Sequence, residues 1–157
     1  QFALQTLECP LWGPIEAKAY VIINDQPIYT DEYAITIKAT LKEDFSKMTV
    51  EELQQAPIIE AHVPALDTLK ADKKYNARLT LTNAGINPLL IRRIVTSDET
   101  ITTTAPKSAI KAGRKADVNL LINTAGLKPG NYTRTITIIT NDPKKSVLNL
   151  AINWVIE

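Results

Sequence analysis

The chain has 157 residues, of which 45% are hydrophobic and 22% charged, and its formal net charge is +1. This composition supports a folded core and excludes wholesale disorder. The charges are scattered and nearly balanced, so no basic field exists that would draw nucleic acid or an anionic membrane. No apolar run approaches the roughly 18 to 20 residues that span a bilayer. The single cysteine, Cys9, excludes an internal disulfide and a multi-cysteine metal site.

The N-terminal part of the chain resembles its C-terminal part. Gly13 and Asn24-Asp25 fall on Gly130 and Asn141-Asp142 at one constant offset. By the same offset, residues 2–7 align with a strand just before the repeated unit. We therefore expect residues 1–42 to be the closing three strands of an incomplete immunoglobulin-like domain. After the turn, and once a short insertion is allowed, the same alternation of apolar residues recurs in both copies: Tyr33, Ile35, Ile37 and Leu41 against Leu148, Leu150, Ile152 and Ile156.

Residues 43–57 form a charged linker with one helix signal. Thr49 and Glu52 have the spacing of a capping box, in which each side chain satisfies a backbone amide of the other residue. Pro57 ends the run, so the linker holds one or two helical turns. A helix this short is not stable alone, and we expect neighbouring packing to hold it in place.

The sequence pattern of residues 58–157 predicts a complete β domain. Short alternating or β-branched runs recur about every ten residues, without a long helical pattern, which is typical of an immunoglobulin-like sandwich. We expect a turn at Asn83-Ala84-Gly85, with Gly85 at positive φ, and a type II turn at residues 127–130. A closing hairpin spans residues 131–154 around Asn141-Asp142-Pro143. The expected strands are 57–63, 75–82, 88–95, 101–104, 116–122 and the two arms of this hairpin.

These motifs resemble a known family. The quoted residues are Thr82-Asn83-x-Gly85-x-x-Pro88-Leu89, Ile110-x-x-Gly113 and Thr135-Ile136-Thr137-Ile138-x-x-Asn141-Asp142-Pro143. Together they resemble an uncharacterised bacterial immunoglobulin-like family, domain-of-unknown-function family fifteen-seventy-three, which is similar to Hydin-type and major-sperm-protein-type domains. The linker is similar to connectors between tandem copies in Bacteroidetes envelope proteins. The resemblance implies export to the periplasm or cell surface. The family's Ser-Cys-Gly-Cys-Thr stretch is replaced here by residues 96–100, which contain no cysteine, so no thiol or metal role carries over.

Few residues suit chemistry. His62 is the only histidine, and a surface or strand-end position explains it better than catalysis. Ligation of a metal by His62 with Glu60 or Asp67 has no recognised spacing in its support. Asp98 and Glu99, with Thr100, could offer oxygens to calcium, but a solvated turn is the more ordinary interpretation. We therefore expect no enzyme, no cofactor and no metal site.

Aromatic residues are the remaining candidates for a contact site. The alternation places Trp154 on the core face of the last strand. Trp12, Tyr20 and Tyr33 are the possible contact residues. The sequence therefore favours a non-catalytic structural or adaptor module that binds a protein partner, or a second copy, through strand edges or sheet faces of residues 1–41. A carbohydrate-binding module using Trp12 is the alternative. Because the chain begins with Gln1 rather than Met, we also expect it to derive from a longer protein.

Overall fold

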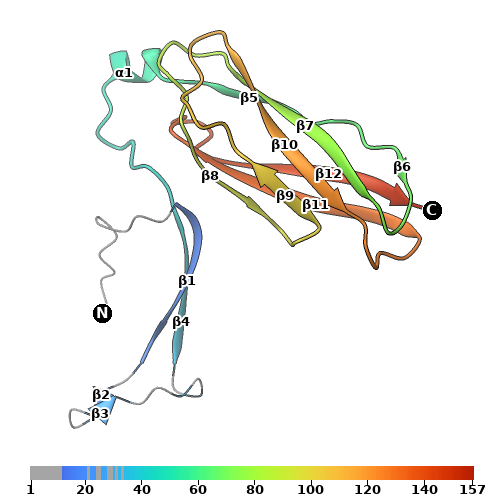
Figure 1. Cartoon of the computed structure of the whole chain (residues 1–157). Helices are drawn as coiled ribbons and strands as arrows, with labels where there is room; N and C mark the ends of the chain where they lie inside the picture. The colour runs from blue at the N-terminus through green and yellow to red at the C-terminus, as the bar shows by residue number, and fades with distance from the viewer. Residues whose placement is uncertain (1–11, 21, 24–25, 28–29, 31, 33) are drawn as a thin grey trace. The chain divides into compact units, whose positions relative to one another are not determined.

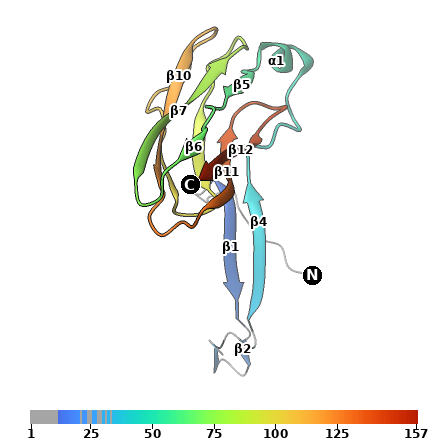
Figure 2. The same ribbon diagram turned by 90° about the vertical axis from the view of Figure 1, so that its right-hand side faces the viewer.

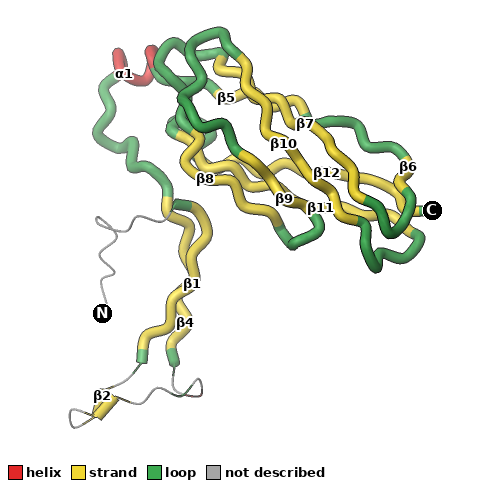
Figure 3. Tube along the Cα trace, in the orientation of Figure 1, coloured by secondary structure: helices red, strands yellow, loops and turns green. Residues whose placement is uncertain are grey.

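The structure is a computed structural model, and it describes residues 12–20, 22–23, 26–27, 30, 32 and 34–157. Contacts divide the chain into two units, residues 1–41 and residues 42–157. Each unit is described by itself (Figure 1). The described residues are almost all strands and loops, with a single short helix, as Figure 3 shows. No helix among them is long and apolar enough to cross a membrane.

In unit 1 the described residues form a two-stranded ribbon. Strand β1 (Gly13–Ala19) pairs antiparallel with β4 (Ile35–Leu41), from Gly13 opposite Leu41 to Ala19 opposite Ile35. Between these two strands the chain makes a short antiparallel pair, β2 (Ile22–Ile23) with β3 (Gln26–Pro27). The third strand expected in residues 2–7 and the turn expected at Asn24-Asp25 lie outside the described residues.

Unit 2 begins with the linker helix. Helix α1 (Val50–Gln55) carries the predicted capping box: the amide of Glu52 donates to the Thr49 hydroxyl, and the amide of Thr49 donates to the Glu52 carboxylate. The helix has less than two turns and buries no side chain. Its C-terminal end is tied to the sandwich by the amide of Asn87, which donates to the Gln55 carbonyl at 2.8 Å. The sequence-based prediction of this helix is confirmed.

Two four-stranded sheets form the rest of unit 2, and Figures 1 and 2 show them as facing layers. The first sheet has the order β5 (Ile59–His62), β7 (Lys74–Asn83), β10 (Lys115–Asn123), β9 (Ile101–Thr104). The second has the order β6 (Thr68–Leu69), β12 (Val147–Ile156), β11 (Gly130–Thr140), β8 (Ile91–Thr96). All pairs are antiparallel except β6 with β12, which are parallel. This arrangement confirms the predicted immunoglobulin-like sandwich.

The core lies between the two sheets and follows the predicted alternation. Inward positions on β7 and β10 are buried, and so are those on β11 and β12, as period two requires. Trp154 is only 3% exposed, which agrees with the core position expected for it. The side chains that form the centre of this core are Leu79, Leu81, Val118, Leu120, Ile122, Ile136, Ile138, Ile152, Trp154 and Ile156.

Three local expectations differ from the structure. Strand β6 was not predicted, because two residues carry no alternation that could reveal them. The turn before β11 is closed by the Leu127 amide on the Thr124 carbonyl, with Gly126 at φ 72°, three residues earlier than the predicted type II turn. Gly85 is not among the residues with positive φ. Gly85 instead allows the backbone of residues 56–58 to pass close to it.

Candidate functional site

The ribbon of unit 1 has one apolar and one polar face. Directly opposed residues in an antiparallel pair project to the same side, so the register fixes which residues share a face. The polar face contains Pro14, Glu16 and Lys18 opposite Thr40, Lys38 and Thr36, and Glu16 forms an ion pair with Lys38 at 3.2 Å. We call the other side the apolar face; its side chains are Ile15, Ala17, Ala19, Ile35, Ile37, Ala39 and Leu41.

The apolar face is poorly covered. Ile35 is 52% exposed, Ala17 and Ala19 are exposed, and Ile37 is only half-buried. Both outer edges of the ribbon also lack a further strand among the described residues, since the sheet contains β1 and β4 alone. A two-stranded ribbon by itself is marginally stable in water. The bare face and the two unpaired edges therefore make the ribbon the strongest candidate for an interaction surface in the described chain.

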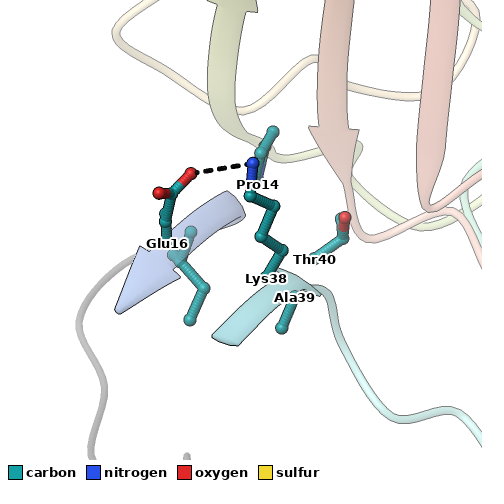
Figure 4. Close-up of a pocket in the computed structure, with 6 residues that line it drawn as sticks. Pro14, Glu16, Lys38, Ala39 and Thr40 are labelled. Atoms are coloured by element: carbon teal, nitrogen blue, oxygen red, sulfur yellow. Dashed lines mark ion pairs between the residues drawn. The ribbon is translucent and has the colours of Figure 1, made fainter. Parts of the chain in front are cut away.

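The ribbon also forms a shallow hollow, shown in Figure 4. Its walls include Pro14 and Glu16 from β1 with Lys38 and Thr40 from β4, and the Glu16–Lys38 ion pair crosses it. The hollow is open to solvent and offers one acid and one base already paired with each other. It has no buried polar group aimed into it, and it lacks the enclosure of a small-molecule site.

Of the three predicted contact aromatics, the structure describes Trp12 and Tyr20, and these two lie far apart along the chain. Trp12 precedes β1 and Tyr20 follows it, and both are half-buried. Eight residues of extended chain separate them, which is roughly 26 Å at the rise of a strand. Tyr33 lies outside the described residues. A sugar ring needs its aromatic platform within a few ångströms, so Trp12 and Tyr20 do not form a shared one.

The polar residues of the family signature hold the end of the sandwich where the linker enters. Asp142 is 1% exposed, and its carboxylate accepts from the amides of Ile59 at 2.9 Å and of Lys144 at 2.8 Å. Asn83 is fully buried and bonds to four backbone groups: it accepts from the amides of Ile58 and Gly85 and donates to the carbonyls of Asn87 and Ile110. These residues are occupied by backbone groups, so they serve structure rather than chemistry.

Gly85 lies where the linker passes closest to the sandwich. A Cβ atom at this position would stand 2.3 Å from the carbonyl oxygen of Ala56 and 2.5 Å from the amide nitrogen of Ile58. Both are backbone atoms that cannot rotate away. The glycine is therefore required for close approach of two chain segments, and not for a positive φ as the sequence suggested.

Arg134 connects the loop at residues 97–100 to the second sheet, which the sequence did not reveal. Its guanidinium pairs with Asp98 and donates to the Thr100 hydroxyl at 3.2 Å. The same group lies 5.4 Å from the ring centre of Tyr132 and 5.8 Å from that of Trp154. Asp98 also accepts from the amide of Thr100 at 2.9 Å. With a cation already beside its carboxylate, Asp98 is poorly placed to bind calcium.

The other candidates for chemistry are dispersed. His62 is exposed at the end of β5, opposite Thr80. In the part of the chain that the structure describes, no three His, Cys, Asp or Glu residues gather closely enough to hold a metal ion. Cys9 lies outside that part. Asp98 and Glu99 do line one open hollow beside β8 and β9, but the Asp98 carboxylate is already paired with Arg134 there.

Several solved structures are similar to this chain to different degrees. A protein of unknown function from Porphyromonas gingivalis W83 has a TM-score of 0.66 and 16% identity over 92% of this chain. The match covers 66% of that protein, so this chain spans just under two thirds of its length. A PapD-like domain of human CEP192 gives a TM-score of 0.47 at 9% identity, covering 76% of this chain and 95% of that domain. The YadV chaperone gives 0.44 at 23% identity, covering 63% and 51%.

The sequence itself has one match of broad extent. No curated protein gives a match to the chain. Residues 58–154, which are most of unit 2 and more than half of the chain, match the family described as "Protein of unknown function (DUF1573)". The match includes the motifs around Asn83 and Asp142 that hold the linker. The chain therefore belongs to the DUF1573 family of proteins of unknown function.

Proposed function

We propose that this chain is a non-catalytic immunoglobulin-like module of an exported multi-domain bacterial protein, and that it acts by protein–protein contact. The carrying observation is the ribbon of β1 and β4, which has a poorly covered apolar face and, among the described residues, two edges without a further strand. Unpaired edges bind other strands by backbone hydrogen bonds, and apolar faces bind other apolar faces by exclusion of water. A protein partner can supply both kinds of contact at once.

The remaining features support an adaptor or spacer rather than an enzyme or a glycan binder. The signature residues Asn83 and Asp142 bond to backbone groups at the linker junction. That arrangement fixes the direction in which the chain enters the sandwich, as a module in a tandem array requires. Trp12 and Tyr20 are too far apart for one sugar platform. From the family likeness we also propose that the protein is located in the periplasm or at the cell surface of a Bacteroidetes cell.

Light scattering coupled to size exclusion, over a wide range of protein concentration, tests the proposal. We expect the chain to self-associate as concentration rises, because apolar faces without a partner bind each other. Ile37→Asp places a charge on the apolar face and should lower association at least about tenfold, which corresponds to about 1.4 kcal/mol. The matched control is Thr36→Asp, which changes the adjacent residue of β4 on the polar face and should leave association unchanged.

Two results contradict the proposal. A monomer at every concentration shows that the apolar face does not drive contact. Equal loss of association in Ile37→Asp and Thr36→Asp shows that the contact does not use the apolar face.

A further inference from the structure

We infer that the partner of the ribbon is the opening part of an immunoglobulin-like sandwich, a set of strands equivalent to β5 through β10 that the ribbon closes. This inference rests on the proposed function and names its partner. This partner presents an apolar sheet face, together with a strand that is free to pair with the outer edge of β1.

The ribbon has the same strand register as the closing hairpin of unit 2. In unit 1, Gly13 pairs with Leu41 and Ala19 with Ile35. In unit 2, Gly130 pairs with Ile156 and Ile136 with Leu150. Counted from the paired glycines, the two ribbons match at all seven pairs of β1 and β4, although the connection between strands is longer in unit 1. A slip by one residue would turn every side chain to the opposite face. The ribbon is thus built as the closing hairpin of a sandwich.

In unit 2 the closing hairpin of β11 and β12 is covered on both edges and on its inner face. There β8 pairs with the outer edge of β11, and β6 pairs with the outer edge of β12. The inner face is covered by the opposite sheet, so that Ile136 and Ile152 have no exposed surface. The matching residues of unit 1 are Ala19 and Ile37, which are exposed and half-buried. Among the described residues the ribbon lacks the equivalents of β5 through β10; residues 2–7, which align with β10, lie outside them.

A second copy of this chain does not offer such opening strands. In each copy β5 through β10 are already closed by β11 and β12, so another copy offers no open set of opening strands. It offers only an identical ribbon. The Porphyromonas gingivalis structure is longer than the stretch it shares with this chain, and that stretch covers more of this chain than unit 2 alone.

Small side chains on the apolar face of the ribbon determine how large the side chains of its partner must be. Ala39 stands at the position of Trp154, Ala19 at that of Ile136, and Ala17 at that of Arg134. The apolar face of the ribbon is therefore flatter than the inner face of β11 and β12. A sheet that packs against it without voids must project larger side chains than β7 and β10 do. The ribbon thus selects a partner different from the opening strands of unit 2.

The experiment supplies opening strands directly. Residues 58–127, which contain β5 through β10, are fused in front of the whole chain. Residues 1–12 then lie between the two parts in sequence, and about ten residues more than in the connection of unit 2 add only a small closure cost. A second fusion also carries Ala19→Ile and Ala39→Trp, which restore the volumes that these strands cover in unit 2. Hydrogen exchange of β1 and β4 is measured in the fusions and in the unfused chain, with β11 and β12 as the internal reference for folding.

We expect the second fusion, at least, to slow exchange in β1 and β4 by about a hundredfold or more and to remove concentration-dependent association. Ile37→Asp within that fusion should abolish the protection, and Thr36→Asp should keep it. Protection that survives Ile37→Asp overturns the inference. So does the absence of protection in both fusions. If the unfused chain meanwhile still associates through Ile37, the proposed function stands and a second copy is the partner; a chain that never associates removes the proposed function itself.

Discussion

The side chain of Asp142 accepts a hydrogen bond from the backbone amide of Ile59, 83 residues earlier in the chain, at 2.9 Å. This bond ties the start of β5 to the turn between β11 and β12, and it is fully buried. The other carboxylate oxygen accepts from the amides of Lys144 and Lys145 inside that turn. One aspartate therefore both shapes its own turn and anchors the first strand of the sandwich.

Loss of this carboxylate should destabilise the whole of unit 2. Asp142→Ala leaves the buried amide of Ile59 without an acceptor, and hydrogen bonds to charged groups contribute about 1.5–3 kcal/mol each. We expect the free energy of unfolding, measured by urea denaturation, to fall by about 3 kcal/mol. The control is Lys144→Ala, an exposed side chain in the same turn, which should change stability by less than about 0.5 kcal/mol. An equal effect of both variants would assign the role to the turn alone.

A methyl group at position 85 should loosen the linker. In Gly85→Ala the new Cβ meets the backbone of Ala56 and Ile58, so either the linker or the loop must shift. We expect a loss of roughly 1–3 kcal/mol in unfolding free energy, as overpacking typically costs. Hydrogen exchange should also rise at the amide of Asn87, which donates to Gln55 at the end of α1. Ala84→Ser adds one atom at the exposed neighbouring residue and should have neither effect.

The ion pair of Asp98 with Arg134 should make stability depend on acid. Burial by itself raises the pKa of Asp98, but hydrogen bonds from Thr100 and the charge and hydrogen bond of Arg134 outweigh it, so that the pKa lies below its ordinary value. A lowered pKa means that the contribution is complete above the ordinary value of about 4 and is lost as pH falls through the lowered one.

Denaturation midpoints between pH 7 and pH 2 can measure this contribution. The Asp98 side chain is 37% exposed, so we expect about 1 kcal/mol or less. Asp98→Asn should lower stability at pH 7 and show a smaller loss on acidification than the parent chain. Glu99→Gln removes a charge from the next residue and should leave the acid dependence unchanged. A parallel loss in the parent and in Asp98→Asn would show that other carboxylates carry the effect.

The sequence predicted the parts of the fold that rest on periodicity and local caps. Alternation placed Ile136, Ile152 and Trp154 in the core, and the capping box located α1 through Thr49 and Glu52. The same alternation, compared between the two ends of the chain, predicted paired strands after Gly13 and up to Leu41, and β1 and β4 pair there. That these strands close an incomplete immunoglobulin-like domain stays a prediction.

Contacts between distant residues were not predictable in this way. Asn141-Asp142-Pro143 was correctly placed at the turn of the closing hairpin, but nothing local indicates that the amide of Ile59 donates to the Asp142 carboxylate. Gly85 was given a role in backbone conformation because glycine commonly has one, whereas the reason is the passage of Ala56 over it. Arg134 occupies an inward position in an alternating strand, so its partner Asp98 emerges only from the fold.

Strands β5 and β6 follow each other along the chain but belong to different sheets, and this has a mechanical consequence. The linker enters unit 2 at the end marked by α1, and the C-terminus leaves at the far end of β12, as Figure 1 shows. Tension applied between these two points loads the parallel pair of β6 and β12 in shear, so that its bonds resist together instead of opening one by one. At the linker end the force reaches the bonds of Asn83 and Asp142 first. A string of such modules would transmit a pull from one sandwich to the next before any strand is peeled away.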